Sequence, residues 1–200
     1  MQKKEQKYRI IACMSGTSLD GLDLALCDFN YREEKIEYKI LDASTFEYSK
    51  EWKEKLANAQ NLSGYELVKL DKDYGLLIAD LLKQFINEKG HSNIDYIASH
   101  GHTVFHRPEQ HITLQIGDGI SIAQALNIPV INDFRSLDVS LNGQGAPLVP
   151  IGDKLLFSDF DYCLNLGGFS NVSFDKNGKR TAFDIAPVNL ILNRYALLFG

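Results

Sequence analysis

Apolar and polar residues alternate through the first part of the chain, as they do in β-strands. Short apolar runs at residues 8–14 and 22–29 predict a β-hairpin, and the alternation of residues 35–46 predicts a third strand. A serine at position 49 can cap a short helix that reaches residue 58. The apolar positions then recur every three or four residues between a capping box at Ser63 and a stop signal at Gly90, which predicts a long helix with one buried face.

The middle of the chain alternates between strand and helix patterns. Apolar runs at residues 94–98, 112–116 and 128–131 predict short buried strands, and a helix is expected between the last two. Strands that alternate with helices in this way are typical of an α/β protein with a mixed sheet.

The opening order of elements recurs near the end of the chain. Strands are predicted at residues 161–166, 172–174 and 180–185, with a hairpin turn at Asn177-Gly178 and Pro187 in the first turn of a helix to residue 199. Strand, glycine turn, strand, turn, strand and helix therefore occur twice. This repetition suggests two related domains with a cleft between them, each lending a glycine turn to one phosphate chain.

Composition narrows the class of protein. A net charge of −5 argues against a nucleic-acid or membrane-surface role, either of which favours a basic face. Cys13, Cys27 and Cys163 have no metal-type spacing and an odd count, so they are interpreted as buried, reduced thiols of a cytosolic protein. The apolar run near the N-terminus is too short for a signal segment or a membrane span.

The most informative segment is the turn at residues 14–23, which reads Met-Ser-Gly-Thr-Ser-Leu-Asp-Gly-Leu-Asp. Its glycines allow close backbone approach, and successive N–H groups with neighbouring hydroxyls can hold an anion. The aspartates would repel a phosphate unless a divalent cation lay between them, as Mg²⁺ does in many phosphate sites. The alternative is an ordinary hairpin turn in which these residues only satisfy the turn geometry. Neither a P-loop nor a Rossmann glycine motif is present in the sequence.

Three further segments are candidates for chemistry or ligand binding. His100, His102 and His106 could bind a metal, but hydrogen bonding to a polar ligand, or packing beneath one, fits their spacing better. Asp133 follows a buried strand, where catalytic groups of α/β sheets gather, so it is a candidate general base with Arg135 orienting a ligand oxygen. A helix cap or a salt bridge explains Asp133 equally well. The loop at residues 141–147 is either ligand-facing or a plain crossover.

These segments, taken together, resemble one known family. The turn at residues 14–23, HGHTVFHRP from His100, LQIGDG from Leu114, NDFRSLDV from Asn132, GQGAPLVP from Gly143 and NLGGFSN from Asn165 stand in the order found in anhydro-N-acetylmuramic acid kinases. The resemblance covers nearly the whole chain. It implies an actin-like (ribonuclease H-like) α/β fold with duplicated domains and mixed sheets flanked by helices. Residues 1–150 would form the first domain, and residues 151–200 the incomplete start of the second.

The resemblance also implies a reaction. Family members open the 1,6-anhydro ring of the sugar with ATP and Mg²⁺ and phosphorylate O6, giving N-acetylmuramic acid 6-phosphate and ADP in cytoplasmic cell-wall recycling. The amino sugar is the expected small-molecule partner, nucleic acid and membrane are not expected, and a homodimer is left open.

Site residues follow from the same resemblance. Asp133 would be the base that activates water, and Asp20 the carboxylate on the Mg²⁺ side. The first phosphate turn would consist of Gly16, Thr17, Ser18, Leu19, Asp20, Gly21, Leu22 and Asp23, and the second of Gly167, Gly168 and Asn171. The sugar would lie against Ser15, His100, Asp118, Arg135 and Gln144. Residues 184–189 depart from the glycine-rich family pattern.

Two rival functions remain at this point. Family members are considerably longer, and a chain of this length could be a fragment, a truncated gene product or a complete protein. A non-catalytic sugar-binding or regulatory remnant is therefore the first alternative, although retention of Asp20 and Asp133 argues against it because unliganded carboxylates are costly. A glycoside hydrolase that uses Asp133 with another carboxylate is a weaker alternative, since it leaves the turn at residues 14–23 unexplained.

Overall fold

The computed structural model describes residues 5–16, 18–33, 35–145 and 148–199. The chain divides into two compact units, Met1–Gly145 and Ala146–Gly200. The assignment of residues 1–150 and 151–200 to two actin-like domains stays a prediction.

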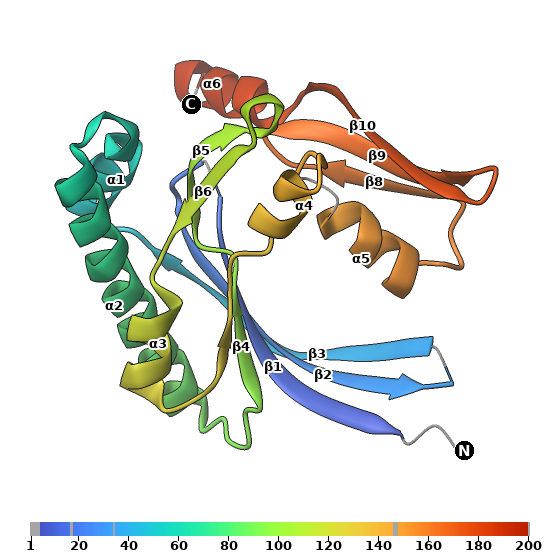
Figure 1. Cartoon of the computed structure of the whole chain (residues 1–200), viewed down its shortest axis with the longest axis horizontal. Helices are drawn as coiled ribbons and strands as arrows, with labels where there is room; N and C mark the ends of the chain where they lie inside the picture. Colours follow the sequence, from blue (N-terminus) through green and yellow to red (C-terminus); the bar gives the residue numbers. More distant parts are fainter. Residues whose placement is uncertain (1–4, 17, 34, 146–147, 200) are drawn as a thin grey trace. The chain divides into compact units, whose positions relative to one another are not determined.

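The first unit is built on a five-stranded mixed sheet with the order β3-β2-β1-β4-β7 (Figure 1). Its strands are β1 (Gln6–Ser15), β2 (Gly21–Arg32), β3 (Lys35–Glu47), β4 (Tyr96–Ser99) and β7 (Val130–Ile131). The hairpin strands β1, β2 and β3 pair antiparallel, whereas β1, β4 and β7 run parallel. Parallel neighbours place their carboxyl ends at one edge of the sheet, and this edge positions the candidate site.

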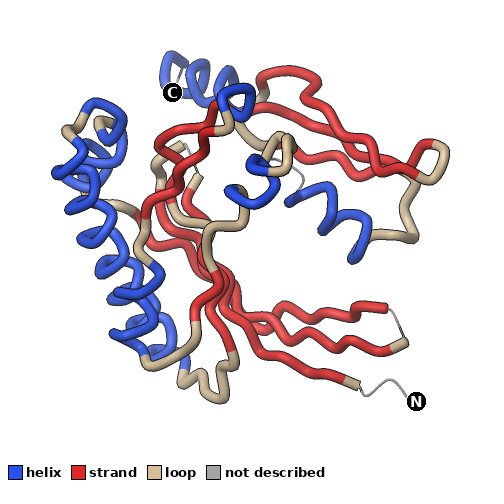
Figure 2. Tube along the Cα trace, viewed as in Figure 1, coloured by secondary structure: helices blue, strands red, loops and turns tan. Residues whose placement is uncertain are grey.

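Helices cover one face of this sheet (Figure 2). The helices of the unit are α1 (Lys50–Ala57), α2 (Gly64–Lys89), α3 (Gly119–Leu126) and α4 (Ser136–Ser140), with short 3-10 turns at Ala59–Asn61 and Pro108–Gln110. Ser49 accepts a hydrogen bond from the Trp52 amide, and Ser63 forms both bonds of a capping box. Gly90 ends α2 in the left-handed conformation. The predicted helix caps are therefore confirmed.

The core lies between α2 and the sheet. The predicted apolar face of α2 is confirmed, because Tyr74, Ile78 and Phe85 are buried there. Ile11 and Ile97 meet them from the sheet and are fully buried. This packing fixes the sheet against the longest helix and gives the edge of the sheet a rigid base.

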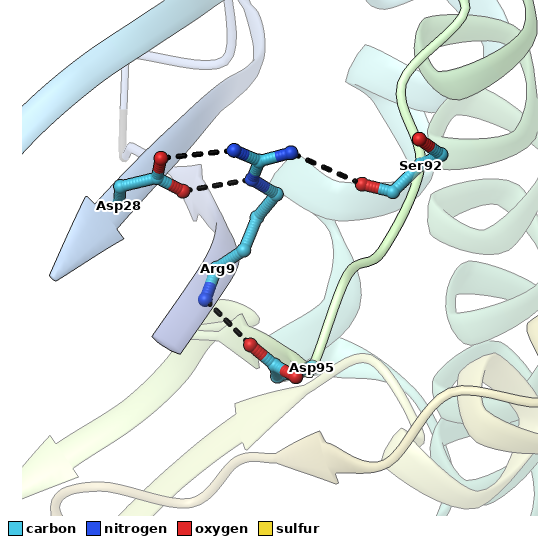
Figure 3. A network of polar contacts seen from close by, with 4 residues as sticks. All are labelled: Arg9, Asp28, Ser92 and Asp95. Atoms are coloured by element: carbon cyan, nitrogen blue, oxygen red, sulfur yellow. Dashed lines mark hydrogen bonds and ion pairs between the residues drawn. The ribbon is translucent and has the colours of Figure 1, made fainter. Parts of the chain in front are cut away.

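At the other end of the sheet, Arg9 of β1 connects this strand to β2 and to the segment that precedes β4 (Figure 3). Its guanidinium donates to both carboxylate oxygens of Asp28, at 2.7 and 2.9 Å, and to the Ser92 carbonyl at 3.4 Å. Its backbone N–H donates to the Asp95 carboxylate at 2.7 Å. These bonds hold β4 beside β1, and a cavity of about 590 Å³ opens here, lined in part by Arg9, Asp28 and Asp95. This cavity lies at the opposite end of β1 from the candidate site, so it is not part of that site.

The second unit contains α5 (Leu148–Leu156), β8 (Tyr162–Leu166), β9 (Phe169–Lys176), β10 (Lys179–Pro187) and α6 (Asn189–Phe199). Its three strands form an antiparallel sheet with the order β10-β9-β8, which repeats the order β3-β2-β1 of the first unit. Asn177 and Gly178 both have positive φ, at 52° and 78°, as the predicted hairpin turn requires. Among the side chains that the structure describes in this unit, Ser170 and Ser173 are buried and no hydrophobic one is.

The fold class predicted from sequence is confirmed as mixed α/β with sheets and flanking helices, whereas the actin-like type with duplicated domains stays a prediction. Three elements were not predicted: β5 (His102–Arg107), which pairs with β6 (Ile112–Ile116) in a separate two-stranded sheet, and the helices α4 and α5. The placement of Pro187 in the first turn of the last helix is wrong. Pro187 ends β10 opposite Phe169, because that strand extends past the bulge at Asp184, and α6 begins at Asn189.

The three thiols are free, as predicted, but they are not equally buried. Cys13 and Cys27 are buried, and burial raises the pKa of Cys13 to about 12. Cys163 is half-buried, which corrects the prediction for that residue, since its strand β8 lies at the edge of a small sheet.

Candidate functional site

The carboxyl ends of β1, β4 and β7 bring three sequence segments to one edge of the sheet. The turn that begins at Gly16 follows β1, His100 follows β4, and Asp133 lies just beyond β7. The backbone N–H of His100 donates to the Cys13 carbonyl at 3.0 Å, which joins the first two ends directly. Functional groups of open α/β sheets gather at such ends, so this edge is the candidate site.

The turn after β1 has an unusual backbone and an ionised carboxylate. Leu19 adopts the left-handed conformation, with φ of 58°, and its N–H donates to the Gly16 carbonyl at 3.4 Å. The Ser18 hydroxyl donates to Asp20 Oδ1 at 2.5 Å. This hydrogen bond is the main cause that lowers the pKa of Asp20, so the carboxylate is charged at neutral pH. Strain of this kind in a non-glycine residue suggests a functional constraint.

The last residues of the predicted phosphate turn have structural partners. A Cβ on Gly21 would lie 2.5 Å from the Phe46 carbonyl oxygen, so the glycine is required for the approach of β3. The Leu22 side chain belongs to the core, and Asp23 accepts a hydrogen bond from Thr45 at 2.6 Å. Thr17 lies outside the described residues. Gly21 and Leu22 also pair with neighbouring strands, so these residues serve the sheet, and their contact with phosphate stays a prediction.

Ser15 lies in a buried polar network that sequence reasoning missed. Its hydroxyl accepts a hydrogen bond from Tyr48 at 2.9 Å and lies 3.3 Å from His102 Nδ1, and the Tyr48 and Tyr74 hydroxyls are 2.6 Å apart. Burial lowers the pKa of His102 and raises the pKa of both tyrosines, so all four groups are neutral at pH 7. The Ser15 hydroxyl is therefore held in a fixed orientation by its neighbours, and its contact with the sugar stays a prediction.

His100 and Arg135 form the centre of the site's described polar contacts. The Arg135 guanidinium donates to His100 Nε2 at 3.0 Å and to the Gly145 carbonyl at 2.5 Å. Because Nε2 accepts, His100 is neutral, and its Nδ1–H donates to the Gly101 carbonyl at 2.9 Å. Burial lowers the pKa of His100, which favours this neutral form. The arrangement fixes the Arg135 guanidinium beside the loop that ends at Gly145.

Asp138 organises that loop. Its carboxylate accepts from the Gly145 N–H at 2.7 Å, and its carbonyl accepts from the Gly143 N–H at 2.8 Å. A Cβ on Gly143 would collide with the Asp138 carboxylate, so glycine is required there. Gln144 stands exposed between these two anchored glycines. The loop is thus a constrained segment, as a ligand-facing loop should be, and the role of Asp138 was not predicted.

Asp133 contacts the first residue of the following helix, α4, and its role as a general base stays a prediction. Its backbone is left-handed, with φ of 56°, and its side chain is exposed. Its Oδ1 accepts from the Ser136 hydroxyl at 2.5 Å and, more weakly, from the Ser136 N–H at 3.4 Å, as a cap of the following helix does. These contacts orient the carboxylate and leave Oδ2 for another partner, as a general base needs.

Asp118 holds a structural position. Its Oδ2 accepts from the Ser121 N–H at 2.7 Å and the Ser121 hydroxyl at 2.5 Å, and it pairs with Lys72 at 2.9 Å. Burial raises the pKa of Asp118, but the Lys72 and Ser121 contacts outweigh it and the pKa is lowered. Asp118 therefore caps α3, and its contact with sugar stays a prediction.

The second glycine turn lies between β8 and β9. The Gly168 and Gly167 carbonyls accept from the N–H groups of Val188 and Asn189, at 2.8 and 3.2 Å, and so position the start of α6. Asn171 pairs with Asn165 in β8 and with Asp184 in β10. Phosphate binding by this turn stays a prediction.

No group of three metal-ligating side chains occurs in the described residues. The three histidines of the 100–106 segment instead contact protein groups: Arg135 and Gly101 for His100, Ser15 for His102 and Thr113 for His106. Asp20 alone could share a cation with phosphate oxygens, which is how Mg²⁺ is commonly held. A cavity of about 190 Å³ lies beside the turn, lined by residues that include Leu19, Gln60 and His102.

The mixed sheet, its helical cover and the strand order define the class: the chain is a mixed α/β protein built on a five-stranded sheet. A family model described as anhydro-N-acetylmuramic acid kinase matches residues 8–197. The chain belongs to that family, and the resemblance stated from sequence is confirmed.

Curated relatives agree with this assignment. The anhydro-N-acetylmuramic acid kinase of Pseudoalteromonas translucida is 39% identical over 206 residues, which cover 93% of this chain and 51% of the relative. The anhydro-N-acetylmuramic acid kinase of Paramagnetospirillum magneticum is 36% identical, over a match that covers 94% of this chain and 53% of the relative. The chain thus spans about half the length of the curated relatives it matches. The solved structure of YeaZ from Pseudomonas aeruginosa matches 90% of this chain and 67% of its own, at 11% identity and a TM-score of 0.27, too loose a likeness to support an inference.

Among the described helices, none is both long and apolar enough to cross a membrane.

Proposed function

We propose that this chain supplies the sugar site, the catalytic base and the first phosphate turn of an ATP-dependent kinase for anhydro-N-acetylmuramic acid. The product would be N-acetylmuramic acid 6-phosphate, formed with ADP during peptidoglycan recycling in the cytoplasm. Family membership over residues 8–197 carries this proposal. The convergence of the turn after Gly16, His100 and Asp133 at one sheet edge supports it. The homodimer stays a prediction.

Asp133 would act as the general base. The free Oδ2 of its oriented carboxylate would take a proton from water as the water oxygen bonds to the anomeric carbon C1. The C1–O6 bond breaks, O6 bonds to the γ-phosphorus, and the bond between that phosphorus and the ADP oxygen breaks. Arg135, His100 and Gln144 would hold the sugar while this occurs, because the first two already form a rigid pair beside the exposed third.

The turn from Gly16 to Asp23 would receive the phosphates. Its backbone would offer N–H donors, and the ionised Asp20, oriented by the Ser18 hydroxyl, suits a cation that bridges to phosphate oxygens. Mg²⁺ bound there would stabilise charge on the transferring phosphoryl group. Gly167, Gly168 and Asn171 would contribute the second phosphate turn.

A second candidate function is a non-catalytic sugar-binding or regulatory protein. The chain covers only about half of its relatives, and the described part of the second unit buries no hydrophobic side chain. Phosphoryl transfer depends on positioning between two domains, so a chain without a stable second domain would bind the sugar and not phosphorylate it.

Product formation separates these candidates. The 200-residue chain is compared with a protein in which residues 1–200 are followed by the C-terminal half of the Pseudoalteromonas relative, both with anhydro-sugar, ATP and Mg²⁺. We expect product from the extended protein and none from the chain alone. In the extended protein, Asp133→Asn removes the basicity and keeps the size, so turnover should fall by about 10²–10⁴-fold while sugar affinity stays within twofold. Turnover within tenfold of the parent would remove Asp133 from the role of base.

A further inference from the structure

Tyr48 contacts both ends of the turn between β1 and β2. Its backbone N–H donates to the Asp20 carbonyl at 3.3 Å, and its hydroxyl donates to Ser15 Oγ at 2.9 Å. Ser15 is the last residue of β1, and Asp20 directly precedes β2. A single residue, which comes immediately after β3, therefore spans the segment that the proposed function assigns to phosphate.

The Tyr48 side chain is itself rigidly held. Its exposed fraction is 5%, and its ring packs against Tyr74 with centroids 6.2 Å apart. The two hydroxyls are 2.6 Å apart, and since the single Tyr48 proton is directed to Ser15, Tyr74 must be the donor between them. Tyr74 is fully buried in the core, so the chain of hydroxyls runs from the core to the start of the turn.

The turn has few internal bonds of its own. Its described internal contacts are the long Leu19-to-Gly16 backbone bond, at 3.4 Å, and the Ser18–Asp20 side-chain bond at 2.5 Å. Leu19 also carries the strain of a left-handed backbone. Strained segments persist only where the surroundings over-determine them. Strand pairing holds the ends of this turn and His102 contacts Ser15, and Tyr48 adds hydrogen bonds to both Ser15 and Asp20.

We propose that Tyr48 is the positioning residue of this turn: its hydroxyl fixes the start, its backbone fixes the end, and together they maintain the conformation of residues 16–20. The consequence for phosphate binding rests on the proposed function, whereas the hold on the turn does not.

Amide hydrogen exchange, measured by NMR on the 200-residue chain, tests this proposal. The amides of Leu19 and residue 48 report on the turn, and that of Ile78 in α2 reports on global stability. Tyr48→Phe removes one hydroxyl and leaves two buried polar groups without a partner, so exchange at Leu19 should rise about tenfold. Exchange at Ile78 should rise too, because global unfolding breaks the same contacts. Leu82→Ala, which changes the core and keeps Tyr48, should raise exchange at Ile78 and leave Leu19 within about twofold. Ser15→Ala removes the acceptor of the same bond and should give the same local rise.

Two matched controls sharpen the test. Tyr65→Phe alters a tyrosine that is 81% exposed and should change none of the three amides. Tyr74→Phe leaves the Tyr48–Ser15 bond in place and should change Leu19 less than Tyr48→Phe does. Unchanged exchange at Leu19 in both Tyr48→Phe and Ser15→Ala, or a rise at Leu19 in Leu82→Ala as large as that in Tyr48→Phe, overturns the proposal.

A final arm separates this proposal from the proposed function. Mg·ATP added to the parent chain should slow exchange at Leu19 if the turn binds phosphate. If Mg·ATP has no effect while Tyr48→Phe still loosens the turn, the phosphate role fails and the positioning role stands.

Discussion

The two units of this chain bury their apolar side chains to very different degrees. The first unit encloses a core between α2 and its sheet, in which Tyr74, Ile78 and Leu82 have no exposed surface. The second unit leaves its strand side chains open: Leu164 is 60% exposed and Phe183 is 53% exposed. Since apolar burial is the main favourable term in folding, the first unit can be stable alone and the second cannot be so to the same extent.

This difference bears on function because the candidate groups are unequally divided. Asp20, His100, Asp133 and Arg135 all lie in the stable unit, at one edge of its sheet. The second unit holds the other glycine turn, on a three-stranded sheet. Under the proposed function, the first unit alone would recognise the sugar, whereas phosphoryl transfer would need both units.

Limited proteolysis should show the contrast most strongly. A protease cleaves opened segments, and opening free energies range from near zero to the global value, so cleavage within residues 148–199 should precede cleavage within residues 35–145 by about a hundredfold in rate. Mass spectrometry of early fragments gives the order. Equal rates, or first cuts inside α2, would show that the two units are equally stable.

A matched pair of leucine substitutions quantifies the same difference. Leu82→Ala opens a cavity in the core of the first unit and should lower the free energy of unfolding by about 2–5 kcal/mol. Leu164→Ala removes a side chain that is mostly in solvent and should change it by less than about 0.5 kcal/mol. Urea unfolding followed by far-ultraviolet circular dichroism, to which both units contribute, compares them. A similar loss in both variants would mean that Leu164 is buried in solution, against a partner or a second copy.

Acidification should weaken the first unit selectively, by a smaller amount. Burial lowers the pKa of His100 and His102 from the ordinary value of 6.5. Below pH 6.5 these histidines therefore bind protons more readily in the unfolded chain than in the folded unit, which favours unfolding. The stability that they contribute is present above pH 6.5 and is lost as the pH falls toward their folded pKa values. All five histidines of the sequence lie in the first unit, so the second should show no such change. The melting temperature between pH 7.5 and 5.5, with His100→Gln as the control, measures this. A flat profile in the parent would contradict it.

Sequence patterns predicted the elements that have a strong period or clear caps. The strands of the first hairpin, the capping box at Ser63 and the buried face of α2 were all predicted, because local residue order determines them. Helix α4 is five residues long and α5 follows directly on Pro147, so neither offers a full apolar period. The end of β10 was misplaced because a bulge at Asp184 carries the strand on to Pro187.

The site was predicted in part for a similar reason. Motif order indicated the turn, His100, Asp133 and Arg135, and strand ends are where such residues function. The roles of Tyr48, Tyr74 and Asp138 were missed, because each contacts the site through the tertiary fold; Tyr48 and Tyr74 stand in no motif, and the motif that contains Asp138 does not indicate its contact with Gly145. Gly21 and Asp118 gained structural roles that only the packing reveals.

The most direct test of this account is the map of anhydro-N-acetylmuramic acid binding on the 200-residue chain, by NMR chemical-shift changes. We predict changes at His100, Arg135 and Gln144 of the first unit, and none in β8, β9 or β10. The shifts at these three residues should weaken in Arg135→Ala and persist in Arg9→Ala, which alters the large cavity at the other end of the sheet. Changes confined to the second unit or to the Arg9 cavity, with His100 and Arg135 unaffected by the sugar, would contradict the assignment of the site.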